Sequence, residues 1–192
     1  MVERICVLTL AESKMQSRTH PENLSALAIE AKTNPAAFSK LYDHYVQPIY
    51  RYLYSRIGSR HEAEDLTSQT FIAAYEALPR YRERGHFSAW LFRIARSKLM
   101  DHFRGSRHEV ELDAVERSAA GEDALNQVIQ DEELNRLKSL ISKLNEKEQD
   151  LIRLRYVADL SFVEMAELLG KREATVRKSV HRLLARLKGQ LE

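Results

Sequence analysis

The 192-residue sequence predicts an all-α protein. Apolar residues recur at helical spacing along most of the chain, and no segment shows the strict alternation typical of a half-buried strand. All four prolines lie at or before Pro79, so proline breaks no helix beyond that point. The glycines fall where the helical periodicity lapses, as expected of turns and helix C-caps. We therefore expect two small helical domains joined by a flexible acidic linker.

Composition limits the classes of function. Hydrophobic residues make up 44% of the chain and charged residues 30%, which is typical of a folded domain. The formal net charge is only +2, so any affinity for nucleic acid has to come from an uneven distribution of charge. The single cysteine, Cys6, excludes an internal disulfide and suits a reducing compartment. Because the apolar run at residues 5–10 is too short for a signal peptide, we expect a cytoplasmic protein without membrane insertion.

The N-terminal third predicts two helices after a disordered extension, residues 1–23. The sequence leaves open whether translation starts at Met1 or at Met15, inside that extension. Residues 24–33 have the pattern of a short helix. Pro35 suits the first turn of the next helix, which Pro48 is expected to break or kink.

A third helix begins after Ser59, where Glu62 stands in capping-box spacing. One face of this helix is apolar, but the other places an isoleucine and a tyrosine, Tyr75, among acidic and polar side chains. This pattern favours a docking surface for another protein. The alternative is a solvated acidic face with one stray apolar residue. The candidate docking residues are Glu64, Asp65, Gln69, Ile72 and Glu76.

The segment 87–104, with the loop 78–86 before it, combines aromatic and basic residues. One arc of the predicted helix is apolar and the opposite arc carries arginines, and the only tryptophan, Trp90, lies between them. Cations can hold phosphates and aromatic rings can stack on unpaired bases, so this surface suits single-stranded nucleic acid. The alternative is a core helix with a solvated arginine face. We expect Tyr81, on the loop, to be the accessible aromatic, whereas Trp90 is either a stacking residue or a core anchor. The candidate residues are Arg80, Tyr81, Arg82, Arg84, Phe87, Trp90, Arg93 and Arg96.

Residues 105–124 are rich in Asp and Glu and predict a linker. A metal cluster is conceivable at His102, His108, Glu109 and Glu111, but scattered surface histidines beside a linker are the simpler interpretation. We expect neither a metal nor a cofactor.

The C-terminal part, residues 125–192, predicts a helix-turn-helix. Asn145 with Glu148, and Ser161 with Glu164, are spaced as capping boxes, and Gly170 separates the last two helices. The second of these helices shows a polar, basic outer face, as a helix in the major groove requires. The alternative is a generic helical hairpin with a basic face. Arg177, Lys178, His181 and Arg182 suit contacts to bases and phosphates.

Three segments in order, 61–75, 87–104 and 151–187, resemble the extracytoplasmic-function (ECF) class of bacterial RNA polymerase sigma factors. The resemblance implies region 2 over residues 24–104, which docks on the polymerase β′ clamp and captures the melted minus-ten strand. It implies region 4 over residues 125–192, which contacts the β flap and duplex minus-thirty-five DNA. The docking and strand-capture roles would fall on the candidates named above. Arg172, Thr175, Arg177, Lys178, His181 and Arg182 match the recognition helix.

The resemblance further implies core RNA polymerase, promoter DNA and an anti-sigma factor as partners, and no enzymatic activity. Ala174, Ser179 and Leu183 depart from common family residues, which leaves the base-reading residues open. Two rival functions remain. A free-standing helix-turn-helix regulator would explain the C-terminal part but not the docking helix. An enzyme is disfavoured because the sequence lacks a Gly-rich phosphate loop and a zinc-protease motif.

Overall fold

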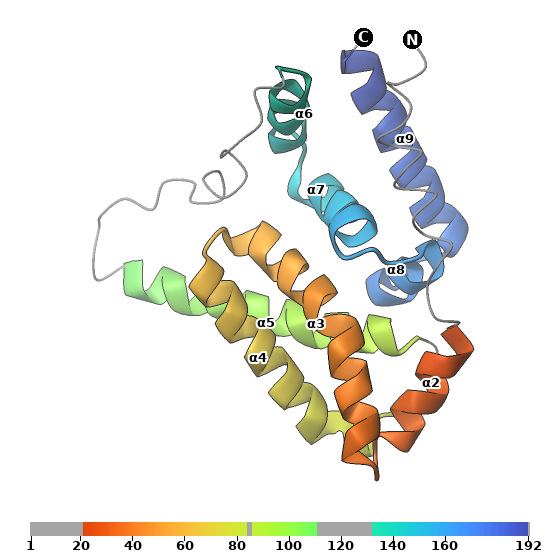
Figure 1. The fold of residues 1–192 in the computed structure, drawn as a ribbon. Helices are drawn as coiled ribbons and strands as arrows, with labels where there is room; N and C mark the ends of the chain where they lie inside the picture. The colour runs from red at the N-terminus through yellow and green to blue at the C-terminus, as the bar shows by residue number, and fades with distance from the viewer. Residues whose placement is uncertain (1–20, 84–85, 111–131, 192) are drawn as a thin grey trace.

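The computed structural model describes residues 21–83, 86–110 and 132–191, and all regular structure within these ranges is helical (Figure 1). The all-α prediction is therefore confirmed for the described part of the chain. Arg84, Glu111, the first 20 residues and most of the acidic linker lie outside these ranges. None of the described helices is both long enough and apolar enough to cross a membrane.

The first bundle comprises α2 (Pro21–Glu30), α3 (Pro35–Ile57), α4 (Arg60–Ala77) and α5 (Phe87–Val110), with a 3-10 turn, η3, at Leu78–Arg80. Helices α3, α4 and α5 pack against one another, and α2 lies against α3 and α5. The predicted cap at Ser59 is present, because its side chain accepts a hydrogen bond from the Glu62 N–H. Gly58 ends α3 in the left-handed conformation, with φ of 79°.

Pro48 does not end its helix, since α3 runs unbroken through it. A proline inside a helix removes one backbone hydrogen bond and costs about 3 kcal/mol. Pro48 is buried together with Leu41, Tyr45 and Ile49, and this packing offsets the local cost. The burial of Pro48 therefore allows α3 to continue despite the local preference of proline.

Two glycines also lie inside helices rather than at their ends. Helix α5 continues through Gly105 to Val110, six residues beyond the predicted boundary at Arg104, and α9 continues through Gly189. Glycine adopts helical backbone angles freely and costs only about 1 kcal/mol relative to alanine. Nothing lies within 4 Å of the position of a Cβ at either glycine. These glycines therefore do not mark turns.

The second bundle comprises α6 (Glu132–Ser142), α7 (Glu146–Ile152), the π-helical turn η4 (Arg153–Val157), α8 (Phe162–Leu169) and α9 (Glu173–Leu191). Both predicted capping boxes are present, at Asn145 with Glu148 and at Ser161 with Glu164. Gly170 ends α8 with φ of 63°, which turns the chain into α9 and completes the helix-turn-helix. Leu144, Leu183 and Leu187 are buried together in a smaller cluster where α6 packs on α9.

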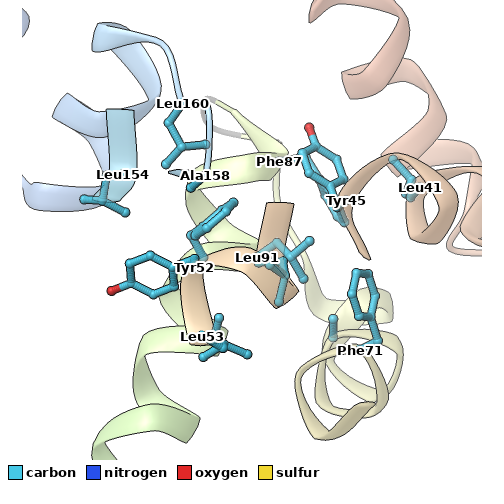
Figure 2. Packing of buried hydrophobic residues seen from close by; sticks show 14 of the residues in the cluster. Leu41, Tyr45, Tyr52, Leu53, Phe71, Phe87, Leu91, Leu154, Ala158 and Leu160 are labelled. Atoms are coloured by element: carbon cyan, nitrogen blue, oxygen red, sulfur yellow. The ribbon is translucent and has the colours of Figure 1, made fainter. Parts of the chain in front are cut away.

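The two bundles share a hydrophobic core. Leu154, Ala158 and Leu160 of the second bundle are buried in the same cluster as Tyr52 and Leu91 of the first, as Figure 2 shows. Helix α8 lies against α5 (Figure 1), and η4 lies against α3. The domains therefore contact each other in the free chain.

Candidate nucleic-acid and protein interfaces

The outer face of α4 is a continuous exposed surface. The five residues expected to dock on another protein, Glu64, Asp65, Gln69, Ile72 and Glu76, are all exposed. Ile72 is 60% exposed, an unusual position for a large apolar side chain. Ile72 is not needed to fill the core, because α4 already buries Leu66, Thr70 and Phe71 on its inner face.

The carboxylates of this face are only loosely engaged. Asp65 Oδ2 lies 3.0 Å from His61 Nδ1, and Glu64 Oε1 accepts from Arg60 Nε at 2.9 Å. These pairs link residues four positions apart and are solvent-exposed, so each contributes little to stability. The acidic groups can exchange such partners for cations on another protein.

The apolar part of the face includes Tyr75, as the sequence predicts, and extends to Tyr42 of α3. Tyr75 is 50% exposed and its ring packs against Phe38, with ring centroids 4.9 Å apart. Tyr42 of α3 is 42% exposed and contacts Phe71 at 4.7 Å. The Tyr42 ring packs on one side and faces solvent on the other, and the helical period of α3 alone does not reveal the second property.

The loop before α5 differs from expectation, because Tyr81 is buried rather than accessible. Its side chain is 5% exposed and packs against Phe87, itself 2% exposed, and Trp90. The Tyr81 hydroxyl donates to Glu83 Oε2 at 2.7 Å, and its carbonyl accepts from Lys32 Nζ. Burial, reinforced by the Glu83 carboxylate, raises the pKa of Tyr81. In this conformation Tyr81 and Phe87 serve as core residues that fix the loop.

Trp90 is the most accessible of these three aromatics, being half-buried on α5 at 4.8 Å from the Tyr81 ring. Arg80, Arg82 and Arg93 are exposed nearby. On α5 itself, Arg93 and Arg104 of the predicted basic stripe are exposed, and Trp90 lies near its start.

Arg96 belongs to the same stripe but is not free. Its Nη1 donates to Asp150 Oδ2 on α7 at 2.8 Å. Tyr52 donates to the other oxygen of that carboxylate at 3.0 Å. Burial, followed by the negative charge of Asp150, raises the pKa of Tyr52. Nothing in the local sequence of α5 indicates this contact.

The residues expected to contact duplex DNA, on α9 and just before it, are all exposed. Arg172, Thr175, Arg177, Lys178, His181 and Arg182 all lie at the surface. The Arg177 guanidinium pairs with Glu173 one turn earlier and lies 5.3 Å from the centre of the Phe162 ring. The Phe162 ring also lies 5.9 Å from that of His181. These contacts place Arg177 and His181 beside Phe162 on the exposed side of the helix-turn-helix.

No group of three or more His, Cys, Asp or Glu side chains suited to a metal occurs in the described ranges. His102 instead lies 4.0 Å from Glu62 on the neighbouring helix. The side chains of His108, Glu109 and Glu111 fall outside what is described.

Family models match both halves of the chain. The model described as Sigma-70 region 2 matches residues 41–109, and that described as Sigma-70, region 4 matches residues 134–187. The two matches cover α4 and nearly all of α5 in the first bundle, and the helix-turn-helix in the second.

Curated relatives share most of the chain. It is 32% identical over 171 residues to the ECF RNA polymerase sigma factor SigW of Bacillus subtilis, an alignment that covers 83% of this chain and 91% of SigW. It is 35% identical over 158 residues to BldN of Streptomyces coelicolor, which covers 79% of this chain. The chain spans 59% of the length of BldN.

Two solved structures also resemble this chain. The chain superposes on CnrH in complex with the cytosolic domain of CnrY with a TM-score of 0.60, at 25% identity, covering 89% of this chain and 96% of CnrH. The sigma factor RpoE from Bartonella quintana, solved with the anti-sigma factor NepR, also gives a TM-score of 0.60, at 22% identity, covering 80% and 96%, and shows the same fold. The chain belongs to the ECF class of RNA polymerase sigma factors.

Proposed function

We propose that this chain binds core RNA polymerase through the outer face of α4 and directs transcription initiation from specific promoters. In this proposal α9 binds the minus-thirty-five element as duplex. The basic face of α5, with Trp90 and the loop arginines, captures the melted minus-ten strand.

The exposed surface of α4 carries the proposal. A row of acidic and polar side chains that includes a 60% exposed isoleucine has the composition of a protein interface. Neither a solitary DNA-binding regulator nor an enzyme requires it. The second bundle supplies the duplex-binding element, because the exposed basic side chains of α9 lie on the second helix of a helix-turn-helix whose turn is made at Gly170.

The remaining partners follow from the family. RpoE from Bartonella quintana was solved with the anti-sigma factor NepR, and we propose an anti-sigma factor as a partner of this chain as well. The proposed setting is the cytoplasm. The proposed role is non-catalytic and needs no cofactor, because the energy for melting comes from strand capture within the polymerase complex.

Co-purification with core polymerase tests the docking step. The chain should elute as a complex with core polymerase in size-exclusion chromatography, whereas a free-standing regulator would elute alone or as a dimer. Failure to associate at micromolar concentrations would contradict the proposal. Asp43→Arg, which alters an exposed carboxylate of α3, serves as a surface control for Asp65→Arg on α4.

A further inference from the structure

One aromatic ring of α8 lies against two of the residues expected to contact duplex DNA. Phe162 is the first residue of α8, and the Cζ atom of Arg177 lies 5.3 Å from the centre of its ring. The His181 ring lies 5.9 Å from the same centre, at an interplanar angle of 37°. Arg177 and His181 are four positions apart on α9, so they are neighbours on one side of that helix. Helices α8 and α9 pack against each other (Figure 1), and the Phe162 ring lies between them and solvent.

The Phe162 ring is held in place by groups other than Arg177. The preceding residue, Ser161, caps α8 through its side chain. On the ring itself, the Arg155 guanidinium carbon lies 4.7 Å from the centre. Arg155 is only 8% exposed, and its Nη1 donates to the Leu160 carbonyl oxygen at 2.9 Å. Because the helix cap and a buried arginine fix the ring, contact with the ring restricts the motion of the Arg177 side chain.

A carboxylate restrains Arg177 as well. Its Nη2 donates to Glu173 Oε1, one turn earlier on α9. A carboxylate on a surface that approaches DNA repels phosphates, so Glu173 lowers the affinity for every duplex. Lys178 and Arg182 differ, because their side chains have no hydrogen-bond or ion-pair partner among the described residues. Arg177 is therefore a weaker phosphate ligand than its unpaired neighbours.

A restrained and partly neutralised guanidinium suits the edge of a base. Recognition of guanine requires two N–H groups aimed together at O6 and N7, and each such pair contributes to discrimination between bases. A side chain that is already restricted loses less conformational entropy when it adopts this geometry. A phosphate contact needs charge and carries no sequence information. The two restraints on Arg177 thus favour base recognition and disfavour phosphate binding.

We propose that Arg177 reads a guanine in the minus-thirty-five element, and that Phe162 and Glu173 are the residues that position it. This inference rests on the proposed function, because it takes α9 as the duplex-binding helix. It assigns one role to Arg177, where the exposure of the side chain alone leaves base and phosphate contacts open. Phe162 and Glu173 act through Arg177 and need no contact with DNA.

Three substitutions separate the two restraints. Phe162→Leu removes the aromatic face and keeps an apolar side chain at the start of α8, whereas Phe162→Tyr keeps the ring. Glu173→Gln removes the charge that pairs with Arg177. Because the Glu173 side chain is 38% exposed, this third variant leaves the apolar core unchanged. The matched control is Val163→Ala, which alters the exposed apolar residue next to Phe162.

The test uses the complex of the full chain with core polymerase. The complex is mixed with promoter duplexes randomised across the minus-thirty-five element, and the bound DNA is sequenced. At each position the ratio of guanine to the next most frequent base is determined on either strand, together with the total fraction of DNA bound. Arg177→Ala should lower the guanine preference at one position about tenfold. Phe162→Leu should lower it at the same position about two- to fivefold, the effect of an exposed cation–π contact.

Glu173→Gln should affect selectivity and affinity in opposite directions. The guanine preference at the position read by Arg177 should fall about twofold, as expected for the loss of an exposed pair four residues apart. The total fraction of DNA bound should rise, because a negative charge near the phosphates is gone. Phe162→Tyr and Val163→Ala should keep the preference of the unmodified chain. A folding defect would weaken binding to all sequences alike and cannot produce this combination.

Two results would overturn the inference. In the first, Arg177→Ala leaves every guanine preference unchanged. In the second, neither Phe162→Leu nor Glu173→Gln relaxes the position that Arg177→Ala relaxes, so Arg177 reads its base without them. Both results leave the proposed function intact, since the unmodified complex still selects promoter sequences. An unmodified complex that selects no sequence at all would contradict the proposed function itself.

Discussion

Arg96 and Asp150 lie 54 positions apart in the chain, yet their side chains meet across the junction of the two bundles, with Nη1 and Oδ2 2.8 Å apart. Tyr52 donates to the same carboxylate from α3. One buried carboxylate thus joins three helices from the two sigma regions. The free energy of unfolding should depend on this group as well as on the shared apolar core.

Because the Tyr52 hydroxyl titrates at high pH, the contribution of this group to the free energy of unfolding can be measured there. Burial and the Asp150 charge raise its pKa above the ordinary value of 10.0, so the folded state holds the proton more tightly than the unfolded state. The resulting stabilisation is present below pH 10 and is lost as pH rises above it, by up to about 1.4 kcal/mol per pH unit. Urea unfolding between pH 8 and 11 should show a steeper loss for the unmodified protein than for Tyr52→Phe. Parallel curves would show that Tyr52 does not titrate differently in the folded state.

The docking face of α4 predicts a strong effect of charge reversal. Asp65→Arg should weaken binding to core polymerase by about 2–5 kcal/mol if this carboxylate meets a desolvated cation there. The thermal melting temperature should change little, because Asp65 is exposed and its pair with His61 is weak. Surface plasmon resonance with immobilised core polymerase measures the loss. Asp43→Arg should bind normally, and equal losses in both variants would point to long-range charge rather than to docking.

The recognition face of α9 predicts losses at Arg177 and Arg182. Alanine at a residue that reads a base should cost about 1–3 kcal/mol and relax sequence preference, whereas loss of a phosphate contact should weaken all sequences alike and reduce the salt slope by about one. Gel-shift titrations of minus-thirty-five duplexes at several salt concentrations separate the two roles. Lys143→Ala, at an exposed lysine after α6, is the control. Unchanged binding and salt dependence in the Arg177→Ala, Arg182→Ala double variant would exclude this helix as the duplex reader.

Substitution of two neighbouring aromatic residues near α5 should affect different properties, folding stability in one case and promoter melting in the other. Tyr81→Ala should lower the free energy of unfolding by about 3–5 kcal/mol, because its buried ring packs on Phe87 and Trp90. Trp90→Ala should instead impair open-complex formation with core polymerase, since stacking on one base is worth about 1–3 kcal/mol.

Permanganate reactivity of promoter thymines measures melting, and a template already unpaired across the melted region serves as the control. The Trp90→Ala defect should shrink on that template, because the cost of unpairing is then already met. Normal melting by Trp90→Ala and by Arg93→Ala would remove the capture role from this surface.

Local sequence rules predicted the ends of several elements correctly. Asn145, Ser161 and Gly170 act through backbone groups within four residues of themselves, so their spacing alone was sufficient. The same local rules fail at Gly105, which lies inside α5, and at Pro48 they allow a break that does not occur. At Pro48 tertiary burial outweighs the local cost.

The sequence was sufficient to predict the exposure of those candidate surfaces that depend on helical period alone. The exposed rows of α4 and α9 follow directly from their apolar faces. The burial of Tyr81 and the contact of Tyr52 with Asp150, 98 positions away, depend on how distant segments pack. No pattern within a single helix contains that information.

The central claim is that this chain confers promoter specificity on core RNA polymerase. Multi-round transcription on a library of randomised promoters, with core polymerase alone and with the chain added, tests it most directly. The account predicts that RNA is enriched from templates sharing two short elements at one fixed spacing, and that Asp65→Arg abolishes this enrichment. Equal transcription from the library with and without the chain, under conditions where a known sigma factor is active, would contradict it.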